Sequence, residues 1–458
     1  MKRSLLFLTL AAALASPAFA AEPVTAEQLA ALEARMQALE ADAAAMRQQA
    51  AEATAALQAA REEIEALKLA QQNPEMASND AGAEPVAETP VAQEAGESGG
   101  NSGANAFNPA ISLVLTGEYA HHSLDPEAYE RAGFPLAGEA GPGEQGLALG
   151  ESEIAMSANI DDKFYGQLTV ALESEDGEVE VGIEEAFVDT TALPNGFALR
   201  MGRFFSNIGY LNNHHAHTDK FNDRPLAYQA FLGNQYGDDG VQLRWVAPTD
   251  LFIELSAEAL RGQNFPSGGA AHDGVGAYTL AAHLGGDVGI ENSWLAGLSM
   301  LRTQTDEGED GFSGDVRLLL ADLTWKWAPD GNTKDGGVQL RTEWFWEDRD
   351  GDYVDAEDPS LDQPWDGSRR GAYVEGVYRI NRQWETGYRY DRLWADADGP
   401  FGTDFDPYRH SAMLSWRNSE FSMLRLMLSR DRPNPDDTDN TVSLQYQAAL
   451  GAHGAHKF

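Results

Sequence analysis

Apolar and polar residues alternate with a period of two from about residue 110 to the end of the chain. Counting back from Phe458, every second position to Val442 is apolar, small or aromatic except His456, while Ser443 and Gln445 are polar. Because successive side chains of a strand point to opposite faces, this pattern predicts strands with one apolar and one polar face. About sixteen such strands are expected, at residues 111–119, 149–160, 164–173, 180–189, 197–203, 241–247, 251–260, 275–284, 293–303, 316–327, 338–347, 372–380, 384–394, 410–416, 421–430 and 441–458.

The connections between these strands alternate in length. Tight turns such as 161–163, 248–250 and 381–383 interleave with long acidic loops such as 347–370 and 395–407. Short turns at one end and long loops at the other are typical of transmembrane β-barrels, and tryptophans at strand ends suit the two membrane interfaces. A β-solenoid or a secreted sandwich would also alternate, but neither needs Leu, Val and Trp on its outward face. The pattern predicts an all-β fold over residues 110–458, an antiparallel transmembrane β-barrel of about sixteen strands.

The first twenty residues have the features of a secretory signal peptide. Lys2 and Arg3 precede an apolar run at 5–14, and the small-x-small triplet 18–20 is a cleavage site. No later stretch approaches the roughly 20 apolar residues of a membrane helix. Membrane insertion would therefore require a closed barrel, since every backbone polar group must be paired within the protein.

Residues 25–71 follow a heptad period. Apolar or small residues occupy both seam positions over six heptads, which predicts an α-helical coiled coil and hence an oligomer, with two or three strands both open. A single Ala-rich helix is the alternative, but it gains nothing from a period of 3.5. Residues 72–108 are rich in Ala, Pro, Glu, Gly and Ser, and are expected to form a disordered linker.

Composition excludes several classes of function. The 458 residues contain no cysteine, and 73 acidic against 32 basic residues give a formal charge of 32 − 73 = −41. Such a protein is not expected to bind nucleic acid, and thiolate chemistry is absent. The Gly-x-Ser-x-Gly match at residues 96–100 lies in the expected linker and not at a strand-to-helix elbow, and the neighbours His410 and Ser411 point to opposite faces of a strand, so enzymatic activity is not expected.

Inward-facing polar positions predict a charged lumen. If Leu168, Val170 and Leu172 face lipid, Glu173 and its alternating equivalents face inward, and a barrel of this size with a charged interior is a pore. Acids outnumber bases in the inward set, which favours cations. The pore-lining residues expected are Glu173, Arg244, Arg341, Glu343, Glu375, Arg379, Glu385, Arg389 and Asp391.

The longest insertion, residues 204–240, lies between the fifth and sixth expected strands. Its Gly202-Arg203-Phe204-Phe205 and Asp223-Arg224-Pro225 elements resemble those of phosphate-selective-porin-like barrels, and the preceding coiled coil is similar to trimeric Gram-negative porins with a periplasmic stalk. The resemblance implies a trimer in the outer membrane, a stalk in the periplasm and a third outer loop folded into the pore. It implies constriction residues at Asn212, Asn213, His214, His215, His217, Asp219, Asp223 and Arg224.

Two departures from related families bear on the solute. Phosphate-selective relatives line the pore with many lysines, and this chain has no such ladder, which argues against phosphate. The chain is also similar to plugless barrels labelled zinc-regulated or TonB-dependent receptors. A true TonB-dependent receptor has a plug and about 22 strands, for which this chain has no room.

Metal binding is a candidate chemistry at His214, His215 and His217, which together with Asp219 offer ligands that zinc accepts. In an extended strip His215 and His217 point the same way and His214 the opposite way. The alternative is a solvated loop whose histidines only titrate. Calcium at acidic clusters such as residues 348–352 is a weaker hypothesis because the helix-flanked calcium loop is absent, and no cofactor is required.

Three functions fit the sequence. The first is a cation-leaning porin for small hydrophilic solutes or ions, in contact with outer-membrane lipid and lipopolysaccharide. The second is a divalent-metal, especially zinc, uptake channel that uses the histidine-rich loop. The third is a structural barrel whose stalk reaches peptidoglycan and tethers the envelope.

Overall fold

A computed structural model describes residues 109–451, except 139, 176–177, 269–273, 306–307, 335 and 356–358. The predicted signal peptide (1–20), coiled coil (25–71) and linker (72–108) lie outside the described residues, and so do 452–458 with Phe458. Those assignments remain predictions.

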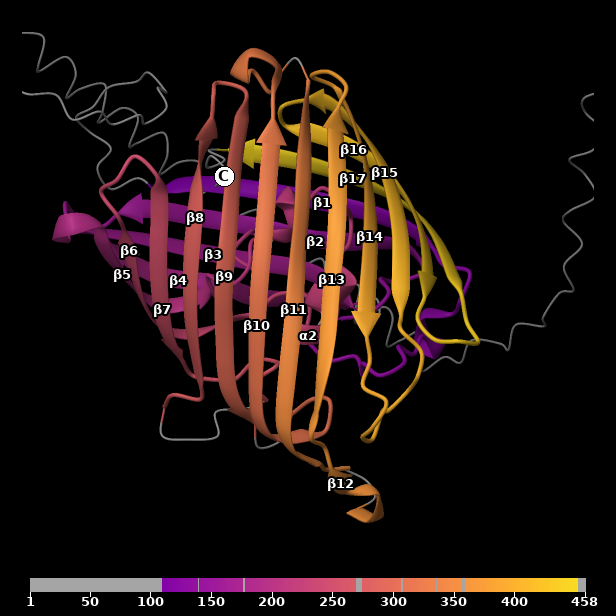
Figure 1. The fold of residues 1–458 in the computed structure, drawn as a ribbon. Helices are drawn as coiled ribbons and strands as arrows, with labels where there is room; N and C mark the ends of the chain where they lie inside the picture. Colours follow the sequence, from indigo (N-terminus) through magenta and orange to yellow (C-terminus); the bar gives the residue numbers. More distant parts are fainter. Residues whose placement is uncertain are drawn as a thin grey trace, which may run out of the picture. The chain divides into compact units, whose positions relative to one another are not determined.

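The described residues form one closed antiparallel barrel (Figure 1). Closure is shown by the first strand, which pairs with both the second and the last. The strands are β1 (Ala110–His121), β2 (Gly146–Asn159), β3 (Phe164–Glu175), β4 (Glu178–Thr190), β5 (Phe197–Phe205), β6 (Gly237–Val246), β7 (Phe252–Leu260), β8 (Ala277–Val288), β9 (Asn292–Thr305), β10 (Phe312–Trp327), β11 (Gly337–Tyr353), β12 (Gln363–Pro364), β13 (Gly367–Arg379), β14 (Trp384–Trp394), β15 (Tyr408–Ser419), β16 (Ser422–Arg432) and β17 (Asp439–Gly451).

The two-residue β12 lies within the connection from β11 to β13, and β11 pairs directly with β13. The barrel therefore has sixteen full strands, which confirms the predicted antiparallel β-barrel of about sixteen strands. The helices are short: α2 (Leu226–Leu232) and the 3-10 turns η1 (Pro126–Ala128), η2 (Pro194–Gly196), η3 (Ala216–Thr218), η4 (Pro329–Gly331) and η5 (Pro359–Leu361). Within the described part of the chain, no helix has the length and apolar content needed to cross a bilayer.

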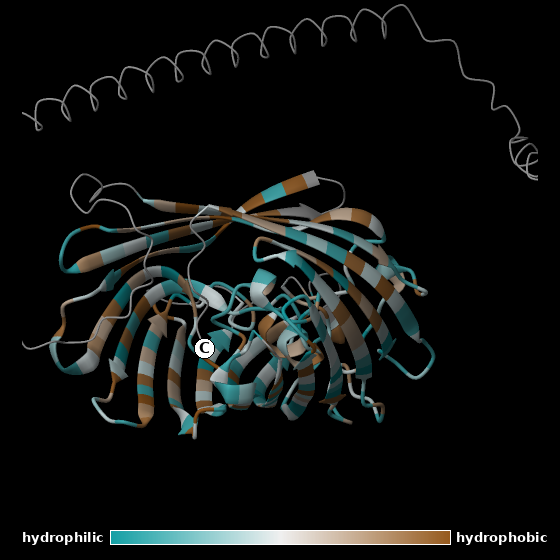
Figure 2. Ribbon diagram, turned by 90° about the horizontal axis from the view of Figure 1, so that it is seen from above, coloured by the Kyte–Doolittle hydropathy of each residue, from teal (hydrophilic) through white to brown (hydrophobic). Residues whose placement is uncertain are grey.

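The two faces of the barrel differ as the alternation predicts. Along β17, Val442, Leu444 and Tyr446 are exposed on the outer surface, whereas Ser443 and Gln445 are buried inside. Figure 2 looks into the ring and shows apolar and polar residues alternating along the strands. An outward apolar surface is stable in contact with lipid, and inward polar groups require water or polar partners.

One long connection folds into the barrel. Residues 206–236, called the inner loop below, join β5 to β6 and carry η3 and α2, and α2 contacts β11, β13 and β14. Phe231 of α2 stacks on Phe345 of β11 with ring centroids 5.8 Å apart, within an apolar cluster that includes Phe134 of the β1–β2 connection. In Figure 1 the label α2 lies beside β11 and β13, two of the strands that the helix contacts. The inner loop therefore has a hydrophobic core of its own, built against one side of the barrel interior.

Local sequence sets both ends of α2. The helix begins after Pro225, and the side chain of Asp391 accepts a hydrogen bond of 3.0 Å from the backbone N–H of Leu226. It ends at Gly233, which has a φ of 56°, a left-handed conformation that favours glycine. A side chain there would also approach the carbonyl oxygen of Ala137 to 3.1 Å. A tight C-terminal turn thus returns the chain to β6.

Candidate functional site

Glu343 of β11 holds the first part of the inner loop. The side chain is fully buried and its Oε2 accepts hydrogen bonds of 2.8 Å from both the backbone N–H of Tyr210 and the hydroxyl of Tyr228. Its Oε1 accepts from the backbone N–H of Leu211 at 3.3 Å and from the hydroxyl of Tyr373 at 2.6 Å. Glu343, predicted to line the pore, is instead an anchor beneath the loop.

Asp223 of the inner loop is held by two arginines on the opposite strands. Its carboxylate lies 2.7 Å from Arg389 and 2.9 Å from Arg409, and the Arg389 Nε also donates to Asp391 at 2.9 Å. Burial by itself would raise the pKa of Asp223, but Arg389 and Arg409 outweigh it and the pKa lies below the usual value of 3.8. Arg389 and Asp391, also predicted to line the pore, are almost completely buried in this contact.

Acid is expected to release this anchor. A carboxyl with a lowered pKa in the folded protein stabilises it fully above the unfolded value, and this contribution is lost as pH falls through the folded pKa. The inner loop should therefore stay docked at pH 5 and become a pepsin substrate only as the pH falls below 3.8, the usual value for an aspartate. Fragments cut within 206–236, identified by mass spectrometry across a pH series, measure this. Rates are expressed relative to an unfolded reference peptide in the same tube, which cancels the pH dependence of pepsin itself. On this scale D223N should be cut equally throughout the range, and a wild-type chain with no pH step would contradict the assignment.

The other predicted constriction residues fold the loop upon itself. The Asn212 amide donates to the carbonyl oxygens of Ser206 and Tyr236, both at 2.8 Å, and thereby closes the neck of the loop. Arg224 donates to the carbonyl of Leu211 at 2.8 Å and pairs with Asp219 at 2.9 Å. Similarly, Asn213 donates to Asn207 at 2.6 Å. These side chains give the loop a defined shape.

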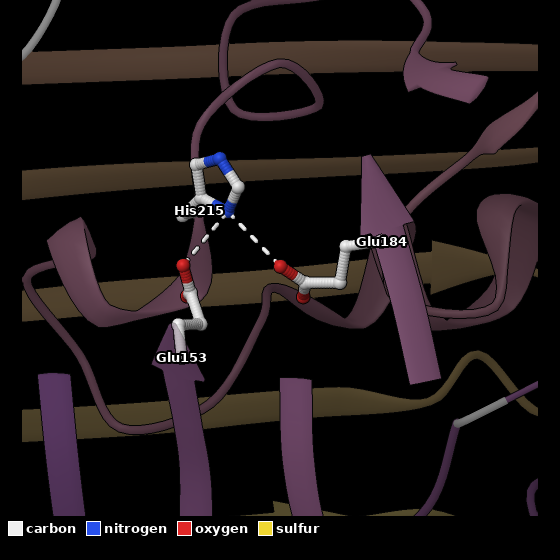
Figure 3. Close-up of side chains that lie close together, drawn as sticks. All are labelled: Glu153, Glu184 and His215. Atoms are coloured by element: carbon white, nitrogen blue, oxygen red, sulfur yellow. Dashed lines mark hydrogen bonds and ion pairs between the residues drawn. The ribbon is translucent and has the colours of Figure 1, made fainter. Parts of the chain in front are cut away.

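The three histidines do not form one site. His214 stacks on Tyr210 at 4.7 Å, and its Nδ1 lies 2.7 Å from the Tyr210 carbonyl oxygen. His215 and His217 stack on each other at 5.7 Å and both contact Glu153 of β2. Figure 3 shows His215 over Glu153 and over Glu184 of β4. The same-side geometry predicted for His215 and His217 is present, and the carboxylates that meet them come from distant strands.

A cavity of about 670 Å³ lies between the inner loop and the barrel end that carries the tight turns. The carboxylate of Glu385 lies in its lining, 2.9 Å from Lys220 of the loop, 3.0 Å from Arg379 and 4.0 Å from Arg417. Burial lowers the pKa of Lys220. The charged lining comprises six basic residues, Lys220, Lys326, Arg341, Arg379, Arg417 and Arg425, and three acidic residues, Asp219, Glu385 and Glu420.

Arg425 adds a positive charge to the cavity lining, and none of its hydrogen bonds goes to an acidic side chain. Its guanidinium donates to Gln445 at 3.1 Å, Ser415 at 3.3 Å and the carbonyl oxygen of Asp219 at 2.7 Å, all uncharged acceptors. Arg341 lies over the Tyr210 ring and pairs with Glu375 at 3.1 Å. The cavity lining therefore carries a positive excess, although the whole chain is strongly acidic.

The remaining predicted residues lie elsewhere. Arg244 is partly exposed and 3.8 Å from Glu254, and the side chain of Glu173 lies outside the described residues. The acidic stretch proposed for calcium lies on β11, where Asp348 faces Arg317 at 3.9 Å. Alternate residues of a strand share a face, so Asp348, Asp350 and Asp352 are spread along one exposed face of β11 and do not form a helix-flanked calcium loop.

No family model matches this chain. Solved structures similar to this chain include a loop deletion mutant of OmpT, an outer membrane protein of Vibrio cholerae, with 12% identity over 76% of this chain and 100% of that one at a TM-score of 0.48. An anion-selective porin from Comamonas acidovorans has 10% identity over 75% and 99% at 0.49. Salmonella typhi OmpF in complex with daunomycin has 12% identity over 76% and 99% at 0.48.

A relative in sequence comes from Aquifex aeolicus and is described as an uncharacterized protein. It is 30% identical over 389 residues, which are 77% of this chain and 80% of the relative. At that identity and coverage, the chain belongs to the same family as this uncharacterized protein of Aquifex aeolicus.

Proposed function

We propose that this protein is an outer-membrane channel for small hydrophilic solutes, narrowed by the inner loop. The observation that carries the proposal is the barrel itself: its outer face is apolar and its inner face is charged, with a cavity of about 670 Å³ beside the loop. A barrel of about sixteen strands is wide enough to enclose a water-filled path. The apolar core of the inner loop narrows that path from one side.

We further propose that the cavity decides which ions pass. The sequence analysis favoured cations because inward acids outnumber inward bases. Several of those acids are engaged in holding the inner loop, as Glu343 and Asp391 are, whereas the cavity has six basic and three acidic residues. A solute crossing the cavity meets a positive field, so the selectivity proposed from the geometry is for anions over cations.

Current through a single reconstituted oligomer tests the channel. We expect stepwise conductance in planar bilayers, and a reversal potential under a KCl gradient whose sign shows chloride preference. A cation-selective current would support the selectivity predicted from composition. A folded protein that inserts but never conducts would instead support a structural barrel that tethers the envelope.

The N-terminal segments form part of the proposal. Removal of residues 1–20 and a coiled coil at 25–71 would give a mature homo-oligomer with a periplasmic stalk, supported by the heptad pattern, and the resemblance to stalked trimeric porins favours a trimer. The mass of the purified oligomer, with and without residues 25–71, distinguishes a trimer from a dimer or monomer.

Divalent-metal uptake is the second candidate function. It is favoured by His215 and His217, which lie against Glu153 inside the barrel. The positive cavity on the path would repel a divalent cation, and this repulsion places metal transport second. Zinc flux into liposomes, compared with chloride flux, separates the two candidates.

A further inference from the structure

Two strand irregularities gather carboxylates on one side of the barrel interior. Along β3 and β4 the register passes from Thr169 opposite Glu185 to Val170 opposite Ile183, so Glu184 is an extra residue with no partner on β3. Along β1 and β2 it passes from Val114 opposite Glu153 to Thr116 opposite Gly150. Such bulges redirect side chains. The bulge on β4 lets consecutive residues Glu184 and Glu185 both reach the inner loop.

His215 is the residue of the inner loop that these carboxylates meet. Its Nδ1 lies 3.1 Å from Glu153 Oε2 and 3.2 Å from Glu184 Oε2, and its Nε2 lies 3.1 Å from Glu185 Oε2. The Nδ1 of His217 is 2.6 Å from the other oxygen of Glu153. One ligand atom each from Glu153, Glu184 and His215 lie within 4.8 Å of one another (Figure 3).

Protonation of the two histidines does not neutralise the negative charge of this cluster. A single N–H on His215 Nδ1 can point at one carboxylate oxygen, yet two lie at nearly equal distance from it. Three carboxylates, Glu153, Glu184 and Glu185, thus face at most two imidazolium charges.

Arg200, beside the cluster, adds little compensation, and Arg224 is paired with Asp219 at 2.9 Å. Arg200 approaches Glu185 to 4.0 Å, but it makes two hydrogen bonds of 2.8 Å to Asp189. Its charge is therefore largely matched by that acid. The cluster keeps a negative excess in a site where the side chain of Glu153 is 3% exposed and that of Glu184 is 15% exposed.

We propose that the cluster binds a divalent transition metal of the zinc class, with Glu153, Glu184 and His215 as its protein ligands. Imidazole nitrogen with carboxylate oxygen is a donor set that zinc accepts, whereas calcium prefers oxygen alone. A tetrahedral zinc with bonds of about 2.1 Å separates its ligand atoms by about 3.4 Å, close to the 3.1 and 3.2 Å found around His215 Nδ1. Glu185 and His217 hold the ligands from behind, as outer-shell groups of metal sites do.

The proposed metal has a structural role, separate from conduction, because its ligands come from parts of the chain that are far apart in sequence. Glu153 lies on β2, Glu184 on β4 and His215 at the start of η3 in the inner loop. The other anchors of the loop, Glu343 and Arg389, lie across the interior on β11 and β14. A bound metal therefore ties the loop to β2 and β4, as a fixed component and not as cargo.

Zinc binding by the folded protein in detergent tests the proposal without any measurement of current. Isothermal titration of the full mature chain, freed of metal by chelation, is expected to show one Zn²⁺ per chain. E184Q and H215Q should each weaken binding at least tenfold. H121N removes an exposed histidine at the end of β1 and serves as the matched control, with unchanged binding.

A second measurement covers variants that fail to fold. The wild-type chain loaded with Co²⁺ should show the visible absorption of a four-coordinate site, and added Zn²⁺ should abolish it. No stoichiometric binding by the wild type, or binding that E184Q and H215Q leave unchanged, would overturn the proposal. Because neither readout depends on conduction, a chain that binds zinc but carries no current refutes the channel alone.

Discussion

Replacing Glu343 by glutamine is expected to detach the inner loop from β11 while the barrel stays folded. The carboxylate accepts four hydrogen bonds in a fully buried position, two of them from the loop backbone at Tyr210 and Leu211. The amide that replaces it has one N–H₂ group, which faces these donors and leaves at least one unsatisfied. Each such loss costs about 1–3 kcal/mol, so docking of the loop should weaken by about 3 kcal/mol, or about a hundredfold.

Hydrogen exchange of peptides from 206–236 measures this change. Their protection should fall by roughly two orders of magnitude, while strand peptides keep theirs. D348N is the matched control because it lies on the same strand with a side chain 63% exposed. Unchanged protection in E343Q would show that the apolar core around Phe231 holds the loop by itself.

The second large effect concerns the cavity. In the double variant R379Q/R417Q, both lost charges lie beside Glu385. At about 7 Å in water each unit charge stabilises an anion by ~0.6 kcal/mol and destabilises a cation by the same amount, so the loss of two charges changes the anion-to-cation ratio by ~2.4 kcal/mol before screening by salt. The permeability ratio should therefore fall by roughly 10- to 50-fold. The cavity lining would then carry four basic and three acidic residues instead of six and three.

Reversal potentials in a KCl gradient provide the measurement. R302Q/R317Q removes the same charge from exposed positions outside the cavity, with side chains 66% and 55% exposed, and should leave the ratio near the wild-type value. An equal shift in both double variants would mean that overall charge, and not the cavity, sets selectivity.

Sequence periodicity was sufficient to predict the strands and their outward faces, but not the contacts inside the barrel. The alternation along β17 predicted which side chains face outward, and Val442, Leu444 and Tyr446 are indeed exposed. The same period assigned Glu343 to the inner face correctly, yet it contained no information on what lies against that face. The hydrogen bond from Tyr210 spans 133 residues, a separation that no local pattern encodes.

The candidate metal ligands show the same division. The histidines were evident as a short motif, and the relation of His215 to His217 followed from strand geometry. The carboxylates that meet these histidines could not be recognised in the sequence. A bulge at Glu184 breaks the period of two from which the inner and outer faces of a strand are predicted. Clusters such as Glu184-Glu185 within a strand are a signal that could have pointed to this irregularity.

The sequence by itself determined the closed all-β fold and the apolar outer face, because burial against lipid selects side chains one strand at a time. Only the tertiary structure decided which inner charges remain available to a solute. That outcome depends on the inner loop, which engages Glu343, Asp391 and Arg389 and leaves an excess of basic residues beside it. The physical reason is that charge compensation inside a barrel is made between segments distant in sequence, where distance and burial, and not composition, set the local field.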